Sequence, residues 1–142
     1  MKPLEIINEY PPNIEDIKKV FNLEGYKPIF CYGDKLYNPH EAVIIPDMLA
    51  HEEVHRIQQN GHPKEWWEQY LSDREFRLRM ETEAYAHQYL YLKKVTKAKI
   101  YNKFLSQFAG LLASTLYGEL LTEKQAETKL RLRAKELSLN VI

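Results

Sequence analysis

One short segment constrains the fold and the function of this chain more strongly than any other. It reads AHEEVHRIQQNGH and places His51 and His55 four residues apart, with Glu52 directly after the first histidine. In an α-helix, side chains four residues apart lie on one face, one turn from each other. Both imidazoles can therefore be directed at a single metal ion.

A helix over residues 48–59 is predicted around this motif, because Asp47 can cap its start and Asn60-Gly61 is typical of a left-handed end. The pattern HExxH on a helix is typical of zinc metallopeptidases. In such enzymes the glutamate does not bind the metal but accepts a proton from the metal-bound water and passes it to the leaving amine. We therefore predict one Zn²⁺ per chain, bound by His51 and His55, with Glu52 as general base.

A catalytic zinc site needs a third protein ligand and an open position for water. A second predicted helix carries Glu83 on an otherwise largely apolar stripe, which comprises Phe76, Met80, Glu83, His87 and Leu90. A buried carboxylate is costly unless a cation is beside it. We therefore favour Glu83 as the third ligand, while an ion pair with a lysine or arginine stays open as the other explanation.

Three further residues are alternatives for the third ligand: Glu81, His62 and His87. Glu81 follows Arg77 by four residues, and a surface ion pair would satisfy it. His62 lies seven residues after His55, one more than in HExxHxxGxxH, and Gln58 stands where that pattern has glycine. His87 lies one turn beyond Glu83. Three roles stay open for it: a metal ligand, a hydrogen-bond donor to the site and a core histidine.

The remaining patterns predict an α+β fold that is predominantly helical, with one small sheet before the HExxH helix. Strand patterns cover Leu4–Ile7 and a hairpin over residues 26–38 around Gly33-Asp34. Further helices are predicted over residues 14–21, from Pro63, over 72–94, over 99–117 and over 122–137, the third and the last opening with capping boxes at Ser72 and Thr122. We interpret residues 1–142 as a single domain, with its core at about 26–95 and C-terminal helices over 97–142.

The composition argues against several classes of partner. Twenty basic and twenty acidic residues cancel, so we expect neither a nucleic-acid nor a membrane partner. The N-terminus has no apolar core of signal-peptide length. The single cysteine, Cys31, lies in an apolar run and suits a buried structural thiol in a reducing compartment. We therefore expect a cytoplasmic protein.

HEEVH, followed on a later helix by Glu81-Thr-Glu-Ala-Tyr-Ala86, resembles the gluzincin branch of the zincins, and most of all the small HExxH proteins of bacteria and their phages. The resemblance spans roughly residues 30–90 and implies a minimal zincin-like metallopeptidase domain. It implies His51, His55 and Glu83 as zinc ligands and Glu52 as base. The 27 residues between His55 and Glu83 exceed the separation in large thermolysin-like enzymes.

The resemblance also implies a substrate site, because zincins bind an extended peptide along an edge strand. That edge would be Lys35, Leu36, Tyr37 and Asn38 here.

The predicted function is hydrolysis of a peptide or protein substrate. The alternative is a non-hydrolytic, zinc-binding protein-interaction module on the same scaffold. Two interpretations of Gln58 stay open, a partner of a ligand histidine and a plain polar residue. Trp66-Trp67 are interpreted as packing residues rather than a substrate wall.

Overall fold

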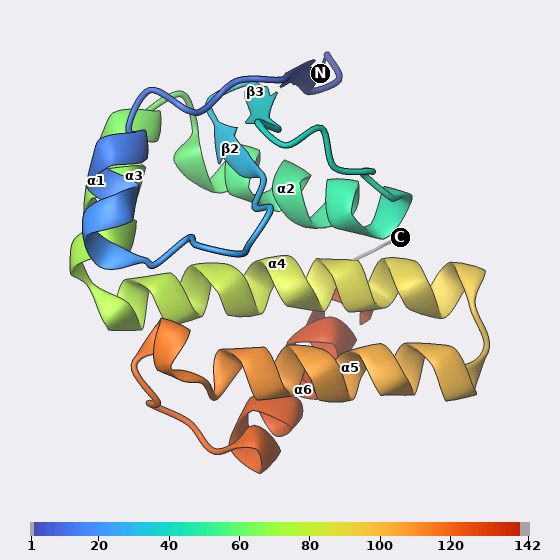
Figure 1. Cartoon of the computed structure of the whole chain (residues 1–142). Coiled ribbons are helices and arrows are strands. Elements are labelled where there is room, and N and C mark those ends of the chain that lie inside the picture. Colours follow the sequence, from blue (N-terminus) through green and yellow to red (C-terminus); the bar gives the residue numbers. More distant parts are fainter. Residues whose placement is uncertain (1, 140–142) are drawn as a thin grey trace. The chain divides into compact units, whose positions relative to one another are not determined.

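The computed structural model describes residues 2–139 (Figure 1). Within that part the chain is predominantly helical and contains one three-stranded sheet, which confirms the predicted α+β class. The chain divides into two compact units, Met1–Ser72 and Asp73–Ile142. The first contains the sheet and the HExxH helix, and the described residues of the second form helices joined by loops, with no strand.

The sheet of the first unit contains β1 (Glu5–Ile7), β2 (Phe30–Tyr32) and β3 (Lys35–Tyr37). Its strand order is β1-β3-β2, with β1 parallel and β2 antiparallel to β3. The two-residue turn between β2 and β3 has Gly33 at φ +63°, a conformation that glycine adopts without steric cost. The predicted strand and hairpin are thus both confirmed.

The helices of the first unit are α1 (Ile14–Val20), α2 (Pro46–Gln59) and α3 (Pro63–Ser72). The predicted cap of α2 is wrong, because the N-cap is Ile45 and Pro46 opens the first turn, as proline does well. Asp47 lies inside that turn, where the helix dipole favours an acid. The predicted end is confirmed by Asn60, the C-cap, which is left-handed with φ 45° and ψ 45°.

Hydrogen bonds from helix side chains attach α2 and α3 to the hairpin. Gln59 Nε2 and Trp67 Nε1 both donate to the carbonyl oxygen of Cys31, at 2.8 and 3.0 Å. The Gly33 amide donates to Gln59 Oε1 at 2.7 Å, so both ends of one side-chain amide are used. Leu36 of β3 packs with Leu4 and Cys31 and has no exposed surface. The helix that carries the motif is therefore held in a fixed position on the sheet.

The second unit contains α4 (Arg74–Val95), α5 (Ala98–Leu112), a 3₁₀ turn η1 (Thr115–Tyr117) and α6 (Glu123–Leu139). The three α-helices pack against one another. Their shared core is apolar, and its fully buried members include Ala86, Leu105, Leu112, Ala126 and Leu130. Only Thr96 and Lys97 separate α4 from α5, so these two helices form a helical hairpin.

Three helix ends in the second unit test the sequence predictions. The cap of α4 is Asp73 rather than Ser72: Asp73 accepts a hydrogen bond from the Phe76 amide at 3.0 Å, while the Ser72 hydroxyl donates to Glu68. The capping box before α6 is confirmed, because the Thr122 and Gln125 side chains each accept the other's backbone amide.

The helix predicted to reach Tyr117 ends at Leu112, since residues 115–117 form a separate 3₁₀ turn that stops at Gly118 (φ +78°). Among the described residues, no helix is both long and apolar enough to span a bilayer.

Candidate metal centre

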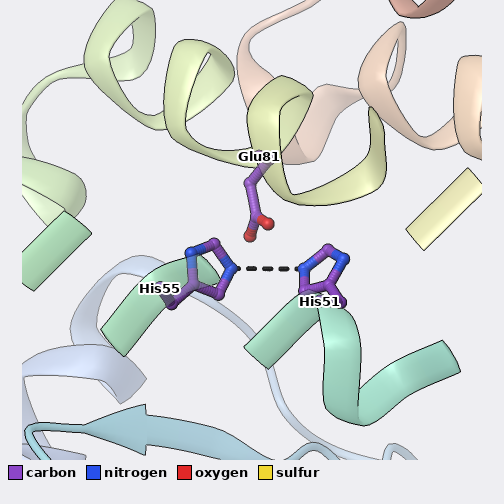
Figure 2. Close-up of side chains that lie close together, drawn as sticks. All are labelled: His51, His55 and Glu81. Atoms are coloured by element: carbon purple, nitrogen blue, oxygen red, sulfur yellow. Dashed lines mark hydrogen bonds between the residues drawn. The ribbon is translucent and has the colours of Figure 1, made fainter. Parts of the chain in front are cut away.

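The two motif histidines lie on one face of α2 and point their Nε2 atoms toward each other (Figure 2). These atoms are 3.2 Å apart, and His51 and His55 are 8% and 6% exposed. Two nitrogens bound to one tetrahedral zinc ion at about 2.0–2.1 Å would lie about 3.3–3.4 Å apart. The helix therefore holds the two imidazoles at a separation that already suits one metal ion.

Gln58 determines which nitrogen of His55 carries the proton. Its Oε1 atom lies 2.9 Å from His55 Nδ1, and an amide oxygen only accepts hydrogen bonds. Nδ1 is therefore the protonated nitrogen, and the lone pair is on Nε2, the atom that faces His51. A neutral imidazole with its remote N–H bonded to an acceptor is the usual form of a metal-binding histidine. Of the two readings of Gln58, a partner of a ligand histidine is the one that this contact supports.

His51, His55 and Glu81 form a buried group that could hold a metal ion (Figure 2). One ligand atom of each, two imidazole nitrogens and a carboxylate oxygen, lies within 4.8 Å of the others. Glu81 is on α4 and is 7% exposed. Two imidazoles and one carboxylate are a donor set that zinc accepts in catalytic sites, so the residues fit that ion.

The favoured third ligand, Glu83, has a different environment. Its carboxylate is bonded to the Arg133 guanidinium of α6 through two contacts, Nε–Oε2 at 2.6 Å and Nη2–Oε1 at 2.9 Å. His87 Nε2 lies 3.4 Å from Glu83 Oε1. The hydrogen bonds from Arg133 hold the pKa of Glu83 below its ordinary value, against the opposing effect of burial. The cation that the sequence argument demanded for Glu83 is thus present as Arg133.

The preference for Glu83 over Glu81 is therefore not supported by this arrangement. The apolar stripe on which this preference was based is not the buried face of α4, because Met80, Glu83, His87 and Leu90 are all partly exposed. Glu81 and Arg77, expected as a surface pair, are both buried. Arg77, Glu81, Ala84 and Gln88 follow the 4-3-4 spacing of one helix face and are all buried, but three of the four are polar, so hydrophobic periodicity in the sequence does not mark this face.

The two other alternative ligands are not part of this group. His62 is exposed beyond the left-handed end of α2, and its backbone amide donates to Gln59 O at 2.7 Å. His87 belongs to the Glu83 and Arg133 cluster, with 40% of its side chain exposed. Neither is among the residues that the structure groups around the motif histidines.

The two glutamates between the histidines have different roles. Glu53 is bonded to the Arg56 guanidinium on the same helix. Glu52 is half-buried, and its charge contributes to raising the pKa of the Cys31 thiol far above the ordinary value, second to the effect of burial. Cys31 is buried and protonated at neutral pH, as expected for a structural thiol.

The predicted substrate edge is wrong. Lys35, Leu36 and Tyr37 form β3, which is the central strand and is paired on both sides. Asn38 extends the pairing of β3 with β1, because its backbone amide donates to Ile7 O. Its side-chain amide donates to Ala42 O and accepts from Ala42 N, which closes a loop. The error arose because β1, distant in sequence, pairs with the hairpin. The outer edge of β2 is also occupied, at Cys31, by the side chains of α2 and α3.

The tryptophans of α3 pack around the motif helix. Trp66 is 7% exposed, and its ring centroid lies 5.3 Å from that of His55. It also stacks on Tyr70, with the two ring centroids 4.9 Å apart. Trp67 is 8% exposed and bonds Cys31. Their role as packing residues is supported, and Trp66 adds an apolar wall beside His55.

No protein-family model, curated protein or solved structure matches the chain.

Proposed function

We propose that this protein is a zinc-dependent metallopeptidase in which His51, His55 and Glu81 bind one zinc ion and Glu52 is the general base. The observation that carries the proposal is the buried group of two imidazoles and a carboxylate, with the two Nε2 atoms 3.2 Å apart. Zinc, when bound, polarises the scissile carbonyl and lowers the pKa of a coordinated water to about 7.

Four residues have a definite part in this chemistry. Gln58 accepts the Nδ1 proton of His55 and so keeps the Nε2 lone pair available. Glu81 contributes the one negative charge among the three ligands. Glu52 accepts the proton of the attacking water and returns it to the leaving amine, so that the peptide bond breaks into a carboxylate and an amine. Trp66 limits the access of water to the His55 side of the site.

The direct test of the proposal has two stages. Purified protein should contain about one zinc per chain, and a chelator should lower its melting temperature, because a ligand that binds only the folded state stabilises it. Glu52→Gln should then retain zinc while peptide cleavage, followed in a proteomic screen against wild type, falls at least about a hundredfold. Protein that neither carries zinc nor is stabilised by added zinc would overturn the proposal.

A second candidate function is a non-hydrolytic zinc-binding module that recognises another protein. The observation in its favour is that β3 is a central strand and that side chains occupy the outer edge of β2, which leaves neither for a substrate peptide. The two functions differ in the Glu52→Gln experiment. The module predicts bound zinc and no cleavage by either protein, whereas the peptidase predicts cleavage by wild type alone.

A cytoplasmic location and a peptide or protein substrate are part of the proposal. The single cysteine is unpaired, which suits a reducing compartment.

A further inference from the structure

The balanced net charge of the chain conceals a strong separation of charge along it. Residues 73–142 contain thirteen Lys or Arg and eight Asp or Glu, whereas residues 1–72 contain seven and twelve. Within the second unit, residues 84–118 contain five lysines and no Asp, Glu or Arg. All five lie between Lys93 and Lys103, around the turn from α4 to α5. We call residues 93–103 the lysine tip.

The lysines of this tip face solvent and are not neutralised. All five are exposed, and none forms an ion pair within the described part of the chain. Lys93 lies over the rings of Tyr89 and Tyr101, at 5.5 and 5.7 Å, and is thereby held at the surface. Five positive charges at one end of a helical hairpin produce a local potential that the net charge of the whole chain does not reveal.

The tip also exposes aliphatic side chains between the lysines. Val95 is 59% exposed and Ile100 is 45% exposed, one on each side of the α4–α5 turn. Tyr91 and Tyr101 are half-buried close by in sequence. Segments that lie at a bilayer surface typically have lysines around exposed aliphatic and aromatic groups. The lipid headgroups bind the charges, and the acyl boundary accepts the apolar groups.

We propose that the lysine tip binds the surface of a membrane that contains anionic lipids. A polynucleotide is the less suitable partner, because arginine is the usual residue for phosphate recognition in nucleic acids and the tip has none. A phosphate backbone also offers nothing to the exposed Val95 and Ile100. This surface therefore differs from the expectation of no membrane partner, which rested on the net charge of the whole chain.

The test is sedimentation of the full-length protein with vesicles. The protein should bind vesicles of phosphatidylcholine with about 30% phosphatidylserine at low salt, and not vesicles of phosphatidylcholine alone. Binding should weaken steeply as sodium chloride rises to about 0.5 M, because salt screens charges at a surface. Equal binding to neutral and anionic vesicles, or none to either, would overturn the proposal without any variant.

A matched pair of variants locates the surface. Lys94→Gln/Lys97→Gln/Lys99→Gln removes three charges from the tip, whereas Lys124→Gln/Lys129→Gln/Lys135→Gln removes three from exposed positions on α6. Each lysine near an anionic surface strengthens partitioning about fivefold, so the tip variant should bind at least about tenfold more weakly. The α6 variant should change less than about twofold, and equal losses in both would contradict a localised site. Both variants replace exposed side chains, and their melting curves check that both remain folded.

Val95→Ser/Ile100→Ser isolates the apolar contribution and should reduce the binding that persists at high salt. Duplex and single-stranded DNA serve as competitors. If either is bound through the same lysines while anionic vesicles are not, the partner is a polynucleotide and the membrane proposal fails. Repeating the experiment with a chelator separates this surface from the proposed metal centre, since vesicle binding should be unchanged.

Discussion

Two helices of this protein each carry a pair of polar side chains four residues apart, two histidines on α2 and a glutamate and a histidine on α4. The two pairs have different surroundings. On α2, His51 and His55 are 8% and 6% exposed and direct two ring nitrogens at each other. On α4, Glu83 and His87 are also four residues apart, but 27% and 40% of their side chains are exposed, and Arg133 of α6 supplies a guanidinium. The first pair suits a metal ion, and the second forms an ion-pair cluster.

The difference shows that spacing selects the face of a helix but does not select the chemistry of that face. Burial and the charge contributed by the neighbouring helix decide whether two such side chains hold a metal or an arginine. Glu81 and Glu83 show this within a single turn of α4, since one is 7% exposed in the group with the histidines and the other bonds Arg133.

The largest effect should come from removing a motif histidine. His51→Ala or His55→Ala should lower zinc affinity at least about a thousandfold, because a direct ligand contributes more than the ten- to hundredfold of an outer-shell residue. Competition with a fluorescent chelator measures this affinity. His87→Ala is the control and should bind zinc as wild type does. Loss of zinc from this control would show that the two clusters are not separate.

The next largest effect separates the two glutamates. Glu81→Gln should weaken zinc binding about a hundredfold, because a neutral amide replaces the anionic ligand. Glu83→Gln should leave zinc affinity within about threefold, because Arg133 rather than a metal is its partner. Isothermal titration of both variants decides between them. The reverse order of affinities would restore Glu83 as the ligand.

A smaller effect is expected at Gln58. Gln58→Leu removes the acceptor of the His55 Nδ1 proton and should lower zinc affinity about tenfold. Gln58→Glu keeps an acceptor at the same place and should recover most of the loss. The visible spectrum of the cobalt-substituted protein gives a second measurement of ligand geometry. A Gln58→Leu variant with wild-type affinity and spectrum would leave Gln58 as a plain polar residue.

The smallest effect concerns the ion-pair cluster. Arg133→Gln should lower the free energy of unfolding by about 0.5–1 kcal/mol, as is usual for a partly exposed pair, and should leave zinc affinity unchanged. Urea denaturation measures the first quantity and chelator competition the second. A change in zinc affinity comparable to that of Glu81→Gln would mean that the two clusters are coupled.

Much of the fold could be predicted from the sequence because its signals are local. Gly33-Asp34 identifies the hairpin, Asn60-Gly61 ends α2, and Thr122 and Gln125 form the capping box of α6. The pairing of β1 with β3 could not be predicted, because it joins segments about thirty residues apart and made β3 central rather than an edge. The hydrogen bonds from α2 and α3 side chains to Cys31 are long-range in the same sense.

The candidate metal group could be predicted as far as His51 and His55, where spacing within one helix is sufficient, whereas the role of Glu52 as base stays a prediction. Which glutamate of α4 is grouped with the histidines depends on which face of that helix is buried, and the apolar stripe in the sequence favoured the face that contains Glu83. Glu83 does have a cation as its partner, as the sequence predicted. This cation is Arg133, which could not be identified from the sequence because it is fifty residues further along the chain and is brought close only by the packing of α6.

The amide of Gln59 has a consequence for how molecules of this protein behave toward one another. By bonding Cys31 O and the Gly33 amide, it occupies the backbone groups that an exposed β2 edge would otherwise offer to a neighbouring chain. Unprotected strand edges are templates for aggregation, and proteins commonly cover them. Together with Trp67, which also donates to Cys31 O, this glutamine at the end of α2 thus covers part of the β2 edge, and Gln59→Leu should favour self-association in concentrated solution.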